Sequence, residues 1–141
     1  MEQSQYQSGI DPTTADEIVS AARTGLGDTL RSIVHFTPAA FDVLYVRRDL
    51  SGDGDAAHEA RSRLVAIERS GFAEKPLRTA LGEGSLERGS VGPYRFTVRF
   101  HDDGFVVRVI EGDRGVLLTA DEMDVRDFEE AAIAIRGILR E

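Results

Sequence analysis

Hydrophobic and polar residues alternate most clearly between Tyr94 and Thr119, and this pattern predicts three consecutive strands. Up to His101 every second residue is apolar, which is the period-2 signature of a half-buried strand. Asp103-Gly104 follows and is typical of a two-residue hairpin turn. The strands are expected at residues 94–101, 105–110 and 115–119, with a second turn at residues 111–114. We therefore expect an antiparallel meander, covered by the surrounding helices.

Three segments have apolar residues at the spacing of an amphipathic helix. The first begins with Thr13 or Thr14 as its N-cap and ends at Gly25 to Gly27. The second covers residues 55–71, and its expected inward face consists of Ala57, Ala60, Leu64, Ile67 and Gly71, with Glu68 off that face. The third runs from about residue 125 or 127 to Leu139, and its apolar stripe consists of Phe128, Ala131, Ala132, Ile135, Ile138 and Leu139.

Two segments before the meander indicate further strands. Residues 30–36 are rich in β-branched and aromatic residues and predict a strand. Residues 41–48 are ambiguous, because their apolar residues fit helical spacing while Val43 and Val46 favour a strand. We interpret them as a strand that forms a hairpin with residues 30–36. Residues 73–92, rich in glycine, predict a long loop with a short turn at residues 77–81.

These elements follow one another in the order α-β-β-α-β-β-β-α, which predicts an α+β domain with a five-stranded, mostly antiparallel sheet flanked by helices. Residues 1–11 are polar and aperiodic and are expected to be a disordered tail, so the single domain covers residues 12–141.

The element order resembles that of roadblock, longin and profilin domains. This resemblance implies homodimers or heterodimers, often with the central helix and an edge strand at the interface. A PAS-like sensor is the alternative, but PAS domains normally have several short helices between strands two and three, where we expect one helix. Fold alone does not fix the function.

Five segments of the sequence carry a further resemblance. They are Arg23-Thr24 with residues 27–32, Tyr45-Val46-Arg47-Arg48-Asp49-Leu50, Glu68-Arg69-Ser70-Gly71-Phe72, residues 115–123 and Phe128-Glu129-Glu130. In these segments the chain resembles a family of small haloarchaeal proteins of unknown function. The resemblance covers roughly residues 16–140 and implies a cytosolic archaeal protein without known catalytic residues.

The amino-acid composition restricts the cellular environment and the kinds of partner that we expect for this protein. The 141 residues carry 25 acidic and 17 basic side chains, a net charge of −8, and Lys75 is the one lysine. A salt-adapted cytosol favours this balance, although a GC-rich genome would also enrich arginine. Nucleic-acid binding is disfavoured, because it normally needs a basic surface and this chain is strongly acidic. The sequence contains no cysteine, no apolar run long enough for a membrane span and no signal-peptide pattern. We therefore expect a cytoplasmic protein that is not membrane-bound.

The candidate chemistry is sparse. His35, His58 and His101 lack zinc-binding spacing, and Asp102 and Asp103 beside His101 fit a turn better than a metal site. There is no nucleophile elbow, and the glycine-rich residues 82–92 match neither a P-loop nor a dinucleotide fingerprint. Pairs of adjacent acids are interpreted as solvated surface groups. We expect no catalytic, cofactor-binding or metal-binding residues, and no cofactor.

The arginines of the meander are less ordinary. A turn at Asp103-Gly104 sets Arg99 directly opposite Arg108, with Arg95 further along the same side. Directly opposed like charges destabilise a sheet unless anions or carboxylates relieve them. Either acids of this chain, such as Glu111 or residues of a covering helix, pair with these arginines, or Arg95, Arg99 and Arg108 contact an anion or an acidic partner.

The sequence therefore favours a non-enzymatic regulatory or scaffolding module that forms a homodimer or binds a protein partner. Its expected interface is the exposed side of the residue 55–71 helix with a neighbouring edge strand. The alternative is a PAS-like sensor that binds a small-molecule ligand in a cavity under the sheet, with residues 73–92 as a lid. An enzyme that uses scattered acids with His35 or His101 is a weaker hypothesis.

Overall fold

The computed structural model describes residues 5–52, 54–83, 89, 91–121 and 124–141. Short 3-10 turns, η1 (Gly27–Thr29) and η2 (Arg48–Leu50), follow α1 and β2. The elements in chain order are α1 (Pro12–Leu26), β1 (Leu30–Phe36), β2 (Phe41–Val46), α2 (Gly54–Glu68), α3 (Ser70–Ala73), α4 (Lys75–Glu83), β3 (Thr97–His101), β4 (Gly104–Glu111), β5 (Arg114–Ala120) and α5 (Val125–Leu139).

The five strands form one sheet in the order β2-β1-β5-β4-β3, and every neighbouring pair is antiparallel. The α+β class, the five-stranded sheet and the choice of strand for residues 41–46 are thereby confirmed. β5 is the central strand, between β1 and β4, and it pairs with β1 although the two are far apart in the sequence, as in the pair of Leu30 with Ala120. The outer strands β2 and β3 form the two edges in the part of the chain that the structure describes.

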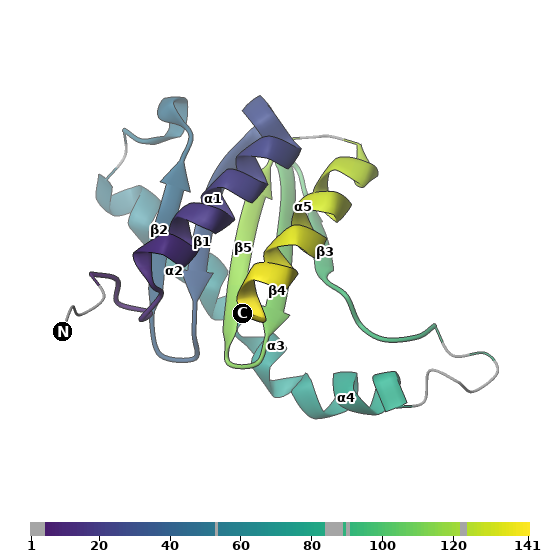
Figure 1. The fold of residues 1–141 in the computed structure, drawn as a ribbon. Coiled ribbons are helices and arrows are strands. Elements are labelled where there is room, and N and C mark those ends of the chain that lie inside the picture. Colours follow the sequence, from purple (N-terminus) through teal and green to yellow (C-terminus); the bar gives the residue numbers. More distant parts are fainter. Residues whose placement is uncertain (1–4, 53, 84–88, 90, 122–123) are drawn as a thin grey trace.

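Helices α1 and α5 lie side by side over one face of the sheet, while α2 and α3 lie behind the other face (Figure 1). A Cβ atom added to Gly25 of α1 would lie 3.1 Å from the Cβ atom of Ala131 in α5, which shows how closely the two helices approach. The core on this face is large and apolar. It includes Ile18, Ala22, Ile33, Val107, Leu118, Phe128 and Ile135.

The opposite face has a smaller apolar cluster under α2 and α3. Its buried members are Val34, Phe36, Val65, Val106, Ile110 and Leu117. This face also buries two charged residues, Glu68 and Arg108. No helix among the described residues is long and apolar enough to cross a lipid bilayer.

The first helix begins earlier than its threonines suggest. The Asp11 carboxylate accepts hydrogen bonds from the backbone N–H groups of Thr13 and Thr14, so Asp11 is the N-cap. Part of the segment that we expected to be a disordered tail lies against the domain. Ile10 is buried in the core of the α1 and α5 face, and Asp42 of β2 accepts hydrogen bonds from residues 7 and 8. Residues 1–4 lie outside the described residues.

The segment between β2 and β3 differs most from the expectation. Val65 and Glu68 are the buried residues of α2, whereas Ile67, which we placed on the inward face, is 56% exposed. Helix α2 has this orientation because the side chain of Glu68 points into the protein and forms an ion pair with buried Arg108 of β4. Residues 75–83 form helix α4 instead of a loop, since a proline in the first helical turn forfeits no intrahelical hydrogen bond. Residues 84–88 and 90 of the predicted loop lie outside the described residues.

The register of the β3–β4 hairpin is shifted by two residues from the prediction. The turn residues are Asp102 and Asp103, and His101 pairs with Gly104. A Cβ atom at Gly104 would lie 2.2 Å from the backbone oxygen of Ala120, so this position requires the close approach that glycine permits. The predicted pairing of Arg99 with Arg108 is therefore wrong, because Arg108 pairs with Thr97. A shift of two residues leaves each side chain on its expected face.

Candidate interaction surface and the arginine cluster

Arg108 of β4 is the largest of the fully buried side chains, with 2% of its surface exposed. Its Nη1 lies 3.3 Å from Glu68 Oε1, and its Nη2 lies 3.0 Å from both Glu74 Oε1 and Thr97 Oγ1. Its Nε has no hydrogen-bond partner among the described residues. Burial alone would lower the pKa of this guanidinium, but Tyr94 and the two carboxylates raise it above its ordinary value. The buried positive charge is therefore permanent.

Glu68 is shared by two arginines. Its side chain is fully buried, and its second carboxylate oxygen accepts a hydrogen bond of 2.7 Å from Nε of Arg99 on β3. Arg99 keeps 43% of its side chain exposed, so it closes the cluster on the solvent side. The acids that relieve the sheet arginines thus come from the covering helices, as one of the two sequence interpretations proposed.

Arg95 does not join this cluster. It precedes β3 and donates a hydrogen bond of 2.8 Å to Glu129 of α5, while its guanidinium lies 5.8 Å from the centroid of the Phe96 ring. The structure therefore brings together Arg99 and Arg108 and places Arg95 beside α5. Contact of these arginines with an anion or an acidic partner stays a prediction, and exposure favours Arg95 and Arg99 for it.

Large apolar side chains are exposed on α2, on α4 and on β3, where Phe100 is 74% exposed. Ile67 of α2 is 56% exposed, and Leu77 and Leu81, one turn apart on α4, are 70% and 48% exposed. The Arg99–Glu68 ion pair ties β3 to the end of α2, so the edge strand and this helix are neighbours. An unpaired sheet edge beside exposed apolar residues is a surface that suits another protein.

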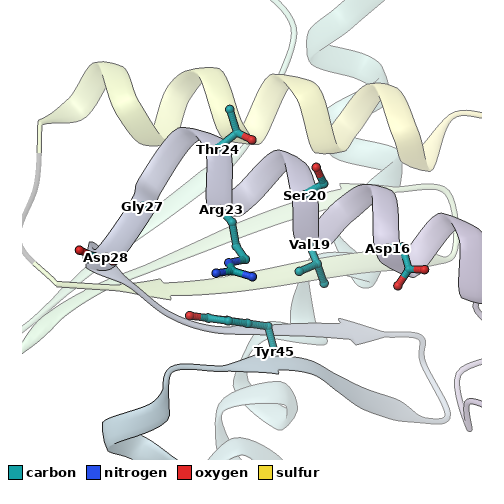
Figure 2. A pocket seen from close by; sticks show the side chains of 8 residues that line it. All are labelled: Asp16, Val19, Ser20, Arg23, Thr24, Gly27, Asp28 and Tyr45. Atoms are coloured by element: carbon teal, nitrogen blue, oxygen red, sulfur yellow. The ribbon is translucent and has the colours of Figure 1, made fainter.

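A polar groove lies on the other side of the molecule, between α1 and β2 (Figure 2). It has a volume of about 450 Å³. The Arg23 side chain points from α1 towards Tyr45 of β2, with its guanidinium carbon 5.4 Å from the ring centroid (Figure 2). Asp16 and Asp28 lie towards the two ends of the groove (Figure 2). This mixture of charges in an open, polar groove does not select one ligand chemistry.

A second polar array, which the sequence did not reveal, surrounds His35. Nδ1 of His35 lies 2.7 Å from Ser8 Oγ, and the Ser8 hydroxyl donates to the Asp42 carboxylate. Because that hydroxyl proton goes to Asp42, Nδ1 donates its own proton to Ser8 Oγ. Nε2 is buried without a partner among the described residues. Burial, with the charge of Arg114, lowers the pKa of His35 to about 4, although Asp42 acts in the opposite direction.

The other histidines do not approach this array. His58 of α2 stacks on Phe41 with ring centroids 5.3 Å apart, and His101 is exposed at the end of β3. Within the described ranges, no three histidine, aspartate or glutamate side chains converge in a way that could hold a metal ion. In the array around His35, Ser8 lies 27 positions before His35 and 34 positions before Asp42 in the sequence. A local sequence motif could therefore not have predicted it.

Comparison with known proteins gives both a family and a fold. Residues 16–140 match the model of the domain of unknown function DUF7522, and the chain belongs to that family. The extent of this match agrees with the resemblance drawn from the sequence, while a haloarchaeal source stays an expectation. No protein with curated annotation is detectably similar to the chain.

Two solved structures share the fold. The gliding protein MglB from Thermus thermophilus superposes with a TM-score of 0.56 at 17% identity, covering 99% of this chain and 98% of that chain. A structure described as MglB with tetrameric arrangement gives 0.53 at 14% identity, with the same coverage of both chains. The fold is therefore of the roadblock/longin type. Three helices, α2 to α4, lie between β2 and β3, so helix number does not distinguish this chain from a PAS domain, but neither similar structure supports the PAS-like alternative.

Proposed function

We propose that this protein is a non-enzymatic regulatory or scaffolding module that forms dimers through the outer face of α2 and the β3 edge. The observation that carries the proposal is the edge of β3, which has no partner strand among the described residues, carries exposed Phe100 and lies next to the end of α2, where Ile67 is exposed. Large apolar residues grouped next to an unpaired strand are typical of protein interfaces.

The comparisons support this proposal at the level of fold. A protein of the same fold, MglB, is described in a tetrameric arrangement, so the fold is compatible with assembly. In this chain, antiparallel pairing of two β3 strands would join two sheets through backbone hydrogen bonds. The α2 helices of the two copies would then cover each other's exposed apolar residues.

The proposed setting is a salt-adapted cytosol. The net charge of −8 makes two copies of the chain repel one another at low ionic strength. Salt screens this repulsion, since the Debye length falls to about 3 Å at 1 M. An apolar interface is strengthened under the same conditions. We expect the dimer to be more stable in molar salt than in dilute buffer.

The first test is light scattering after size-exclusion chromatography, in molar potassium chloride and at low salt. The expected result in high salt is a mass about twice the 15.5 kDa of the chain. Ile67→Glu should shift the mass to that of the monomer. The matched control is Ile133→Glu, because Ile133 is a similarly exposed isoleucine, 49% against 56%, on α5.

A strict monomer at micromolar concentration in both salts would contradict dimerisation. An equal loss of dimer in the Ile67→Glu and Ile133→Glu variants would contradict the placement of the interface. An acidic partner, if one binds, should lose affinity when Arg99 or Arg95 is replaced by glutamine, since both guanidinium groups remain partly exposed.

A further inference from the structure

A second cavity lies between the inner side of α2 and the sheet. It has a volume of about 320 Å³. Its floor is formed by β1 and β5, where Val34 and Leu117 are buried. Leu50 of η2 lies at its margin, and α2 supplies the opposite wall. Residues 73–92, the lid of the sensor hypothesis, contribute nothing to its lining among the described residues.

The cavity exists because the first half of α2 has small side chains where it passes the sheet. Ala57 and Ala60 line the cavity together with Leu64, whereas Val65 further along the helix is buried against the sheet. A leucine in place of either alanine would occupy much of the space. Ala60 is itself exposed, which shows that the cavity opens to solvent at this position.

The polar groups of the cavity differ in how far they are already paired. On the floor, the hydroxyls of Ser32 and Thr119 lie 2.6 Å apart and satisfy each other. Arg31 lies 3.0 Å from the Asp121 carboxylate. Arg61 of α2 also lines the cavity, and it has no carboxylate within 4.0 Å among the described residues. The cavity therefore combines apolar walls with one uncommitted positive charge.

This combination is the usual composition of a small-molecule site, which is mostly apolar and has a few polar groups that fix the ligand's orientation. The volume lies at the lower end of the range of about 300 to 1,000 Å³ found for ligand pockets. It is too small for a dinucleotide but suits a compact aliphatic or aromatic acid. Since the Arg61 guanidinium has no carboxylate partner in the part of the chain that the structure describes, it favours a ligand carboxylate, whose two oxygens match its N–H groups.

We propose that this cavity binds a small amphiphilic carboxylate. Its apolar part lies on Val34, Leu64 and Leu117, and its carboxylate is bound by Arg61. A cationic ligand is disfavoured because Arg61 would repel it, whereas the charge of Arg31 is already balanced by Asp121. The site uses the inner side of α2, so it does not depend on the proposed dimer, which uses the outer face.

The test uses octanoate, octanol and octylamine as probes, each titrated into the full chain by isothermal calorimetry under identical salt. The three probes share an apolar chain and differ in the charge of the head. Octanoate should bind about tenfold more tightly than octanol, the difference expected for one charge-assisted hydrogen-bonded pair. Octylamine should bind more weakly than octanol.

Arg61→Gln should reduce the affinity for octanoate about tenfold, to that of octanol, and leave octanol unaffected. The matched control is Arg63→Gln, because Arg63 lies on the same helix but pairs with exposed Glu59 and does not line the cavity. Filling the cavity with Ala57→Leu should abolish binding of all three probes. Ala60→Phe replaces that variant if circular dichroism shows that Ala57→Leu does not fold.

Three results would overturn the proposal. They are equal affinity for octanoate and octanol, equal losses in the Arg61→Gln and Arg63→Gln variants, and undiminished binding in a folded cavity-filling variant. Saturable octanoate binding by a monomeric chain would uphold the site even if the dimer were disproved, so the two proposals fail independently.

Discussion

The two faces of the sheet each bury a titratable group, and they do so in opposite ways. On the α1 and α5 face, His35 is 1% exposed and is kept neutral, with its pKa lowered to about 4. On the α2 and α3 face, Arg108 is 2% exposed and stays charged, with Glu68 and Glu74 beside it. The first face avoids a buried charge, and the second surrounds one with carboxylates.

The difference follows from what covers each face. Long amphipathic helices cover the first face and leave a continuous apolar core. The second face is covered by α2, whose sheet-facing residues are mixed, with two alanines, an arginine and a glutamate among them. The apolar cluster of the second face is smaller than that of the first. The second face also holds the buried ion pairs of Arg108 and the 320 Å³ cavity. The first face therefore has the larger apolar core, while the second combines buried charge with the cavity for which we propose a ligand.

The largest expected effect comes from Glu68→Ala. This substitution leaves Arg108 buried beside the more exposed Glu74 and removes the partner of Arg99. Removing one partner of a buried ion pair costs about 3–5 kcal/mol of unfolding free energy. Urea denaturation followed by circular dichroism measures this loss.

Glu59→Ala is the control for that experiment, since Glu59 is an exposed glutamate of the same helix, paired with Arg63. It should leave the urea midpoint unchanged. The double variant Glu68→Leu with Arg108→Met should recover most of the loss, because apolar residues of similar size can replace a buried ion pair. If Glu68→Ala were as stable as Glu59→Ala, the second face would not depend on its ion cluster.

The next effect is a pH dependence that originates on the first face. His35 has a pKa of about 4 in the folded protein against an ordinary 6.5, so the unfolded chain binds a proton more readily between these values. Stability is therefore fully present above pH 6.5 and falls as the pH drops through this window, by about 3 kcal/mol in total. Urea midpoints measured from pH 7.5 to pH 4 report the slope.

His35→Gln should remove most of that slope, and His101→Gln, which alters an exposed histidine, should leave it intact. The low pKa of Asp121 beside Arg47 and Arg31 adds a further loss of stability only in more acidic solution. An unchanged slope in His35→Gln would show that the first face tolerates a charged histidine after all.

The smallest effect compares one glycine from each face. A Cβ atom at Gly71 would lie 2.4 Å from Ile110 Cδ1 and 2.7 Å from Arg108 Cζ, so Gly71→Ala should cost about 1–3 kcal/mol through overpacking. Gly137 of α5 has no atom near its Cβ position, and Gly137→Ala should stabilise the helix by about 0.5–1 kcal/mol. Thermal unfolding of both variants should show midpoint shifts of opposite sign.

Local patterns were sufficient for most of the fold. The alternation in the meander and the apolar stripe of α5 identify the strands and the last helix, because these elements bury one face against a single core. The hairpin register was not predictable, since turns at Asp102-Asp103 and at Asp103-Gly104 keep the same residues on each face. The observed register brings Gly104 close to the backbone oxygen of Ala120 on another strand, a contact that a local pattern does not contain.

The candidate sites were less predictable, because they depend on contacts between distant residues. Glu68 was assigned to the polar side of its helix, and its burial follows from Arg108, which lies 40 positions later. The arginines of the predicted meander indicated that acidic groups would lie near them. The sequence pattern did not identify Glu68 and Glu74 as those groups. The cavity beside Arg61 depends on how α2 turns against β1 and β5, which the alanines of α2 did not reveal.

The position of β5 has a consequence for synthesis of the chain. β5 lies between β1 and β4 at the centre of the sheet, and its residues pair with β1 residues 79 to 90 positions earlier, from Phe36 with Gly115 to Leu30 with Ala120. Until β5 has emerged from the ribosome, β1 has only β2 beside it, and its other edge lacks the strand that it pairs with in the folded sheet. Closing such distant pairs is slow, so this edge of the nascent chain is open to aggregation and to chaperones until the last fifth of the protein has been made.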